Sequence, residues 1–205
     1  MRGVLGVGIV FSFLVAGVTH AATQDSKMVL FLSSPEVDTE LSRTCFGFVK
    51  NNVRGQLRRD LTLLRSAGFG PEEQLRVFSA MRSDGDALVV VLVNVATNSA
   101  PVVTYSEKRG SAVVNIAMLD AAEEITEQGR VARIERAAMY AVGRLVGMPA
   151  CLNPYCALSE YVHVQKNKVL GRNYCPHCSD RVAAGLKAVG VVGPVSRRGD
   201  SPSAK

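Results

Sequence analysis

The sequence RIERAAMYAVGRLVGMPACLNPYC covers residues 133–156, and CPHC follows at residues 175–178, after 18 intervening residues. Four of the five cysteines lie in this stretch, as Cys151-x4-Cys156 and Cys175-x2-Cys178. Each close pair can span one edge of a tetrahedral zinc site, and the segment between the pairs can loop back to close it. Because four thiolates fill the coordination shell, the sequence predicts one structural zinc ion with no open position for water.

Two other interpretations of the cysteines stay open. In an oxidising compartment, Cys151 could pair with Cys156 and Cys175 with Cys178 as disulfides. The order Cys-Pro-His-Cys also resembles the redox motif of thioredoxin-class thiol oxidants, which would make the chain a thiol-disulfide oxidoreductase. That motif begins a helix early in its fold, whereas only 27 residues follow Cys178 here. The fifth cysteine, Cys45, lies on an apolar helical stripe and is interpreted as a small buried hydrophobe.

The helix predicted before Cys151 carries a resemblance to a known family. Archaemetzincins, which are zinc metalloproteases, have the motif H-E-x-x-H-x-x-G-x-x-H-C-x4-C-x-M, followed later by C-x-x-C. The four cysteines match both pairs of this pattern, and Gly147 matches its glycine. The resemblance implies an α/β domain of metzincin type, with a mixed β-sheet packed with helices. In such a domain a long active-site helix precedes the zinc-bound C-terminal segment.

The catalytic positions of that motif are all different in this chain. Tyr140, Arg144 and Ala150 stand where the family has its three zinc-binding histidines, Ala141 stands at the general-base glutamate, and Leu158 replaces the methionine. Arginine is a permanent cation that cannot bind a metal ion, and alanine cannot take a proton from water. We therefore expect no zinc-dependent peptidase activity; a divergent zinc metallopeptidase is the alternative.

Tyr140 and Arg144 share one face of the predicted helix, because they are four residues apart. Together they form a candidate ligand-binding site for a peptide carboxylate or another anion. In the competing hypothesis, Arg144 pairs with Glu135 or another acid, or faces solvent. His163 and His177 are the only histidines after residue 21, so no other three-histidine site can form.

The rest of the chain fits a mixed sheet covered by helices. Apolar and β-branched runs predict strands at residues 28–32, 87–95, 101–105 and 112–119. Helical spacing of apolar residues predicts helices at 37–64, 71–81, 129–146 and 180–189. Ser34 is the expected N-cap of the first helix, and Gly147 is the expected stop of the third.

The two ends of the chain differ from the body. Residues 1–21 resemble a secretory signal, with Arg2, an uncharged apolar run and small residues around Thr19-His20-Ala21. The run is short for a membrane span, although an uncleaved anchor is the alternative. We expect export to a periplasm or secretion, and no stable membrane span once the signal is removed. The expected domain covers residues 25–190, and a polar, disordered tail covers residues 194–205.

Composition bounds the function further. The chain has 205 residues and is 47% hydrophobic, which suffices for one domain with a core. The net charge is +6, and no dense basic run with interleaved aromatics supports nucleic-acid binding. Together with the cysteine spacing and residues 1–21, the resemblance implies an exported, non-catalytic pseudoprotease that is held together by zinc and binds an unidentified protein or peptide partner.

Overall fold

The computed structural model describes residues 26–62, 69–96, 101–120, 126–160 and 171–193. The signal predicted at residues 1–21, the tail predicted at residues 194–205 and His163 lie outside these ranges. No helix in the ranges is long and apolar enough to cross a membrane. The elements, in chain order, are β1 (Met28–Ser33), α1 (Thr39–Asn52), β2 (Leu57–Leu61), α2 (Pro71–Ser79), β3 (Asp86–Val93), β4 (Val103–Ser106), β5 (Ser111–Asn115), α3 (Ala117–Asp120), α4 (Glu127–Leu145) and α5 (Pro176–Ala188).

The strands form one mixed sheet in the order β2-β1-β3-β5-β4. Neighbouring strands are parallel except for the edge strand β4, which runs antiparallel to β5. Of the inner strands, β1 and β3 have the sequences MVLFLS and DALVVVLV, and nearly all of their residues are buried. Such continuous apolar runs are typical of strands covered on both faces. The predicted mixed α/β class is therefore confirmed.

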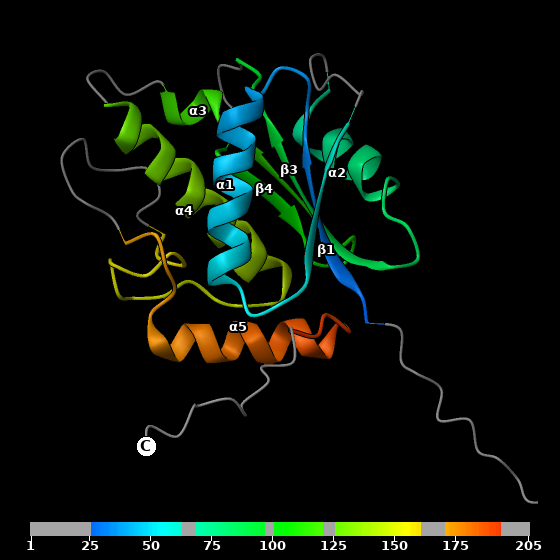
Figure 1. Ribbon diagram of the computed structural model, residues 1–205, viewed down its shortest axis with the longest axis vertical. Helices are drawn as coiled ribbons and strands as arrows, with labels where there is room; N and C mark the ends of the chain where they lie inside the picture. The colour runs from blue at the N-terminus through cyan, green and yellow to red at the C-terminus, as the bar shows by residue number, and fades with distance from the viewer. Residues whose placement is uncertain (1–25, 63–68, 97–100, 121–125, 161–170, 194–205) are drawn as a thin grey trace, which may run out of the picture.

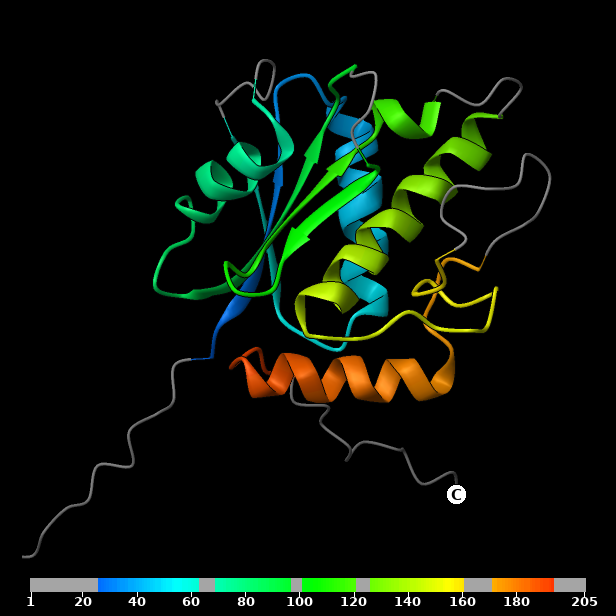
Figure 2. The same ribbon diagram turned by 180° about the vertical axis from the view of Figure 1, so that it is seen from behind.

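Helices cover both faces of this sheet (Figure 1), with α1 and α4 on one face and α2 on the other. Side chains along β1 alternate between the two faces, because successive residues of a strand point in opposite directions. Phe31 packs on the α1 side, with its ring 5.8 Å from that of Phe46, whereas Leu30 packs in the cluster that contains Leu75 and Phe78 of α2. Helix α5 runs across one end of these layers, as Figure 2 shows from behind.

The prediction of one helix over residues 37–64 is wrong. Helix α1 ends at Asn52, and β2 begins at Leu57 and pairs with β1. Leu57 and Leu61 continue the helical stripe because they are four residues apart, but the same spacing also places two residues on one face of a strand. The cap prediction is also wrong, since the Asp38 side chain accepts the first bond of α1 from the Leu41 N–H at 2.8 Å.

Helix α4 carries the resemblance described above, and its boundaries follow from local chemistry. Thr126 caps its start by accepting a hydrogen bond from the Gly129 N–H at 3.1 Å. Beyond its end, Gly147 has φ +75°, a left-handed conformation that side chains disfavour, and its N–H donates to the Arg144 carbonyl at 3.1 Å. The predicted stop at Gly147 is confirmed. Helix α5 begins at Pro176, four residues before the predicted start.

Candidate metal centre and the helix before it

The four cysteines predicted as ligands lie together in the structure. Each of Cys151, Cys156, Cys175 and Cys178 offers a sulfur, and all four sulfurs lie within 4.8 Å of one another. The Sγ atoms of Cys151 and Cys175 are 4.0 Å apart, and all four side chains are free thiols. Zinc–sulfur bonds of about 2.3 Å in a tetrahedron place the sulfurs about 3.8 Å apart. The group, called the sulfur cluster below, therefore has the donors and spacing to hold a metal ion.

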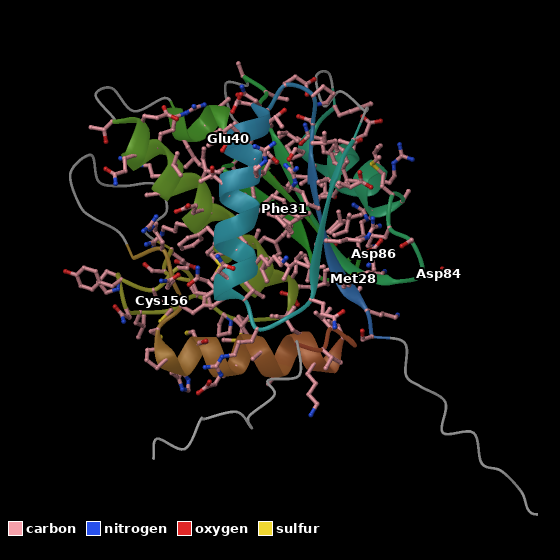
Figure 3. The ribbon with its side chains drawn as sticks, viewed as in Figure 1. Met28, Phe31, Glu40, Asp84, Asp86 and Cys156 are labelled. Carbon is pink, nitrogen blue, oxygen red and sulfur yellow. The ribbon has the colours of Figure 1, made fainter. Side chains whose placement is uncertain are left out.

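Two short segments bring these sulfurs together. Cys151 and Cys156 lie in the loop after α4, where the Cys156 N–H donates to the Asn153 carbonyl at 3.0 Å and closes a turn. Cys175 is the N-cap of α5, and Cys178 lies in the first turn of that helix. The Cys175 N–H donates to the Cys156 sulfur at 3.4 Å, which joins the two segments directly. Figure 3 labels Cys156, in the loop beside α1 and α4 and close to the start of α5.

Electrostatics in the sulfur cluster oppose four free charges. Burial raises the pKa of Cys156 above its ordinary value, and burial with neighbouring thiols raises the pKa of Cys178. Burial acts in the same sense on Cys175, but hydrogen bonds from Cys178 and the other cysteines bring its pKa below the ordinary value. Four thiolates at this spacing need a cation among them, because a bound metal ion offsets both desolvation and mutual repulsion.

The helix face predicted to bind a ligand is filled by an arginine between two tyrosines. Arg144 donates from Nη1 to the Met148 carbonyl at 2.8 Å and from Nε to the Tyr105 hydroxyl at 2.8 Å. Its guanidinium carbon lies 4.9 Å from the Tyr105 ring centroid and 5.9 Å from that of Tyr140. We call Tyr105, Tyr140 and Arg144 the arginine stack. Sequence analysis missed Tyr105, which lies on β4, 39 residues before Arg144.

The charge of Arg144 is stabilised where it lies. Burial opposes that charge, yet hydrogen bonding to Tyr105 and the nearby carboxylate of Glu107 hold the pKa of Arg144 above its ordinary value. Burial also raises the pKa of Tyr140, so its phenol stays neutral and is a poor metal ligand. The hypothesis that Arg144 pairs with Glu135 is wrong, because Glu135 accepts from Arg172 at 2.6 Å.

The other candidate residues have ordinary structural places. Ala141, at the position of the general base in the resembled motif, is fully buried in the core. His177 is exposed on the first turn of α5, and Cys45 is buried in the core, as predicted. Within the described ranges, the sulfur cluster is the one group of three or more His, Cys, Asp or Glu residues that could hold a metal ion.

Comparison with known proteins gives structural matches alone. No protein-family model matches the chain, and no curated protein matches it in sequence. The zinc-dependent peptidase from Methanocorpusculum labreanum superposes with a TM-score of 0.59 at 15% identity, covering 75% of this chain and 99% of that one. Archaemetzincin from Methanopyrus kandleri gives 0.60 at 14% identity, covering 82% of this chain and 99% of that one.

A third match is archaemetzincin from Archaeoglobus fulgidus complexed with malonate, with a TM-score of 0.53 at 10% identity, covering 75% of this chain and 99% of that one. All three chains are matched over almost their whole length, and they contain the same arrangement of sheet and helices. At these identities the likeness concerns architecture. The chain has the archaemetzincin fold.

Proposed function

We propose that this protein is an exported, non-catalytic member of the archaemetzincin fold that holds one structural zinc ion and acts as a binding module. One contrast carries the proposal. Four sulfurs converge at Cys151, Cys156, Cys175 and Cys178, while Arg144 lies where the resembled motif has a zinc-binding histidine. The thiols supply the donors that zinc prefers for structural sites, and four of them leave no position open for substrate or water.

The arginine stack supports the absence of peptidase chemistry. A catalytic zinc site keeps three protein ligands and a water molecule, with a carboxylate nearby to take the proton. Here a guanidinium, a neutral phenol and the methyl group of Ala141 stand at three of those positions. A fixed positive charge repels a divalent cation, and the hydrogen bonds of Arg144 to Tyr105 and Met148 hold that charge in place.

We further propose that the arginine stack binds a carboxylate, most simply the C-terminal carboxylate of a peptide. Guanidinium carries five N–H groups in a planar fork that matches a carboxylate. The contacts to Tyr105 and Met148 account for three of those groups on Arg144, which leaves two N–H groups without a partner among the described residues. The archaemetzincin from Archaeoglobus fulgidus is complexed with malonate, a dicarboxylate, which supports this class of ligand.

Metal analysis of the purified chain tests the main proposal. We expect one zinc ion per chain and none in the double variant Cys175→Ser/Cys178→Ser. Two zinc ions per chain, with cleavage of a peptide library, would favour the divergent metallopeptidase. Absence of zinc, with a readily reduced Cys175–Cys178 bond, would favour the thiol-disulfide oxidoreductase.

Peptide binding tests the ligand proposal. A set of peptides with free C-terminal carboxylates is compared with the same set as C-terminal amides, using wild type and Arg144→Ala. We expect measurable binding for free carboxylates to the wild type alone. Arg133→Ala is the matched control, because Arg133 lies on the same helix and has no hydrogen bond or ion pair in the described ranges. Equal affinity of wild type and Arg144→Ala would end the idea.

Export is supported by the charge and hydropathy of residues 1–21. The mature N-terminus, read by mass spectrometry from cell fractions of the native host, tests it. We expect the first residue to follow Ala21 and the protein to lie outside the cytoplasm. Full-length protein in the cytoplasmic fraction would contradict export.

A further inference from the structure

Arg136 of α4 is among the largest fully buried side chains, with 2% of its surface exposed. Arginine is rarely buried this far unless an acid pairs with it. Arg136 belongs neither to the sulfur cluster nor to the arginine stack, so neither site explains why it is buried. Its guanidinium donates from Nη1 to the Gly171 carbonyl at 2.9 Å and from Nη2 to the Ser159 carbonyl at 3.3 Å.

No acid balances the charge of Arg136 in the part of the chain that the structure describes. The neighbouring acid, Glu135, is already paired with Arg172, whose guanidinium also lies 5.0 Å from the Phe48 ring. Among the described residues no hydrogen-bond partner faces the buried Nε atom of Arg136, and burial lowers the pKa of the side chain. Two carbonyl dipoles solvate a guanidinium only in part, so the described residues leave this buried cation without a counter-charge.

The two carbonyls that Arg136 contacts belong to the segments that carry the sulfurs. Ser159 is three residues after Cys156 and donates its N–H to the Cys156 carbonyl at 3.0 Å. Gly171 is four residues before Cys175 and lies directly against Tyr155, because an added Cβ would be 1.7 Å from the Tyr155 carbonyl oxygen. A charge on Cys156 acts on Arg136 and favours the cation. Arg136 is therefore placed beside the sulfur cluster from the helix side.

The charge balance of metal binding supplies what Arg136 lacks. When four thiols bind a divalent ion they release four protons, and the resulting complex carries a net charge of two minus. Desolvating part of this dianion is costly, as is burying a cation, unless opposite charges lie close to each other. Each of the two groups thus offsets the desolvation cost of the other.

We propose that Arg136 is the internal counter-cation of the metal-loaded sulfur cluster, a positioning residue that favours the loaded form over the metal-free form. The inference rests on the zinc site proposed above. Linkage between two groups is reciprocal, so the loaded cluster must also favour the charged form of Arg136. Arg136 strengthens metal binding, and in the metal-free protein the same unpaired charge weakens the fold.

Substitutions at one position separate this role from simple packing. Arg136→Met keeps the volume and removes the charge, Arg136→Gln keeps a donor without the charge, and Arg136→Lys keeps the charge without the fork. Arg133→Met, on the same helix, is the matched control. Zinc affinity is measured by competition with a chromophoric chelator, and thermal unfolding is followed for loaded and metal-free protein.

We expect Arg136→Met and Arg136→Gln to weaken zinc binding by about 10- to 100-fold, the range typical of groups that support metal ligands. Arg136→Lys retains most of the affinity, and Arg133→Met retains all of it. Metal-free Arg136→Met is at least as stable as metal-free wild type, because a buried unpaired charge has been replaced by an apolar side chain.

Two results would overturn the proposal. The first is equal loss of stability in loaded and metal-free Arg136→Met with unchanged zinc affinity, as expected for a packing role alone. The second result is an equal zinc affinity of the Arg136→Gln and Arg136→Lys variants. This comparison decides the matter if Arg136→Met does not fold. Cobalt substitution gives an independent readout, because the sulfur-to-metal charge-transfer band shifts to lower energy when the cation is lost. Wild-type protein without zinc would contradict the metal site proposed above, and this result is distinguishable because it is obtained before any variant is made.

Discussion

The sulfur cluster and the arginine stack both involve residues at or after the end of α4, and they differ in the side chains that stand at the metal-ligand positions of the resembled motif. In the cluster every donor of the resembled motif is present, and the sulfurs lie within 4.8 Å of one another. In the stack Tyr140 and Arg144 stand at two histidine positions of the motif, and the guanidinium of Arg144 is held by Tyr105 and Met148. A structural metal is part of the folding free energy, whereas a catalytic metal can be lost without unfolding the chain. The comparison teaches that an arginine at a ligand position of the motif can be held in place by contacts within the chain itself.

The largest expected effect is on the cluster side of this comparison. Cys175→Ser/Cys178→Ser removes two ligands, so the metal is lost and the start of α5 is released from the loop after α4. We expect the free energy of unfolding to fall by about 4 kcal/mol or more, as for other losses of a structural metal. Urea unfolding with parallel metal analysis measures it. Cys45→Ala is the control; it leaves the zinc content unchanged and costs about 1 kcal/mol. A double variant as stable as wild type would break the comparison.

The next prediction tests whether the stack differs from a catalytic site only by its side chains. The combined variant Tyr140→His, Arg144→His and Ala150→His restores the three histidine ligands of the resembled motif. We expect the zinc content to rise from one to two ions per chain, because the backbone already has the archaemetzincin arrangement. The same variant with Arg144 retained should bind one ion, since a fixed cation repels the second. An identical zinc content of the two variants would contradict the prediction that Arg144 excludes the second ion.

A third prediction uses the pH dependence of stability to distinguish metal release by the sulfur cluster from protonation of a carboxylate elsewhere in the fold. Arg58 contacts Asp86 with two hydrogen bonds, at 2.8 and 2.6 Å, and Ser83 donates to the same carboxylate, so the pKa of Asp86 is lowered to about 2. A lowered pKa stabilises the fold above the unfolded value near 4 and loses that effect as the pH falls towards 2. The contribution is about 2 kcal/mol. As the pH falls, the sulfur cluster releases its metal at a higher pH than that at which Asp86 takes up its proton, because thiolates are protonated before this carboxylate.

Asp86→Asn measures the lower step. We expect the variant to be less stable than wild type by about 2 kcal/mol at pH 6 and equally stable near pH 2. Urea unfolding across this range checks it, with Asp84→Asn as the control, because Asp84 is exposed in the same turn (Figure 3). A difference that stays constant with pH would contradict the assignment.

The smallest effect is expected in the stack. Tyr105→Phe keeps the ring over Arg144 and removes the hydroxyl that accepts from Nε. We expect a loss of about 1 kcal/mol in the free energy of unfolding, with the zinc content unchanged. Differential scanning calorimetry and metal analysis measure both. Tyr155→Phe is the control, since Tyr155 is 71% exposed on the cysteine loop. A loss of zinc in Tyr105→Phe would mean that the two regions are coupled.

Local patterns in the sequence were enough for the features that depend on a few neighbouring residues. The runs MVLFL and ALVVVLV predict β1 and β3 because strands buried on both faces need continuous apolar residues. Cysteine spacing predicts the sulfur cluster, since ligand pairs must span tetrahedron edges. Gly147 predicts the end of α4 through its left-handed conformation. The boundary between α1 and β2 was missed, because Leu57 and Leu61 fit the period of either structure.

The residues that sequence analysis missed are held by distant parts of the chain. Arg136 lies opposite the apolar stripe of α4, so helical periodicity places it in solvent. The structure buries it because the segments around Ser159 and Gly171 cover that second face of the helix. Tyr105 lies beside Arg144 only because β4 pairs with β5 at the edge of the sheet. No local pattern carries such information, because it is a property of the assembled sheet and helices.

The position of helix α5 bears on whether the domain could be cyclised or circularly permuted. Its first turn carries Cys178, and just beyond its last turn the Gly190 carbonyl accepts from the Lys27 N–H at 2.9 Å, while Lys27 and Val191 form a parallel bridge. The start of β1 and the chain after α5 therefore lie side by side (Figure 1). A peptide of a few residues could join them and turn the domain into a covalent ring. New ends could then be opened in an exposed turn, with the order of strands in the sheet unchanged.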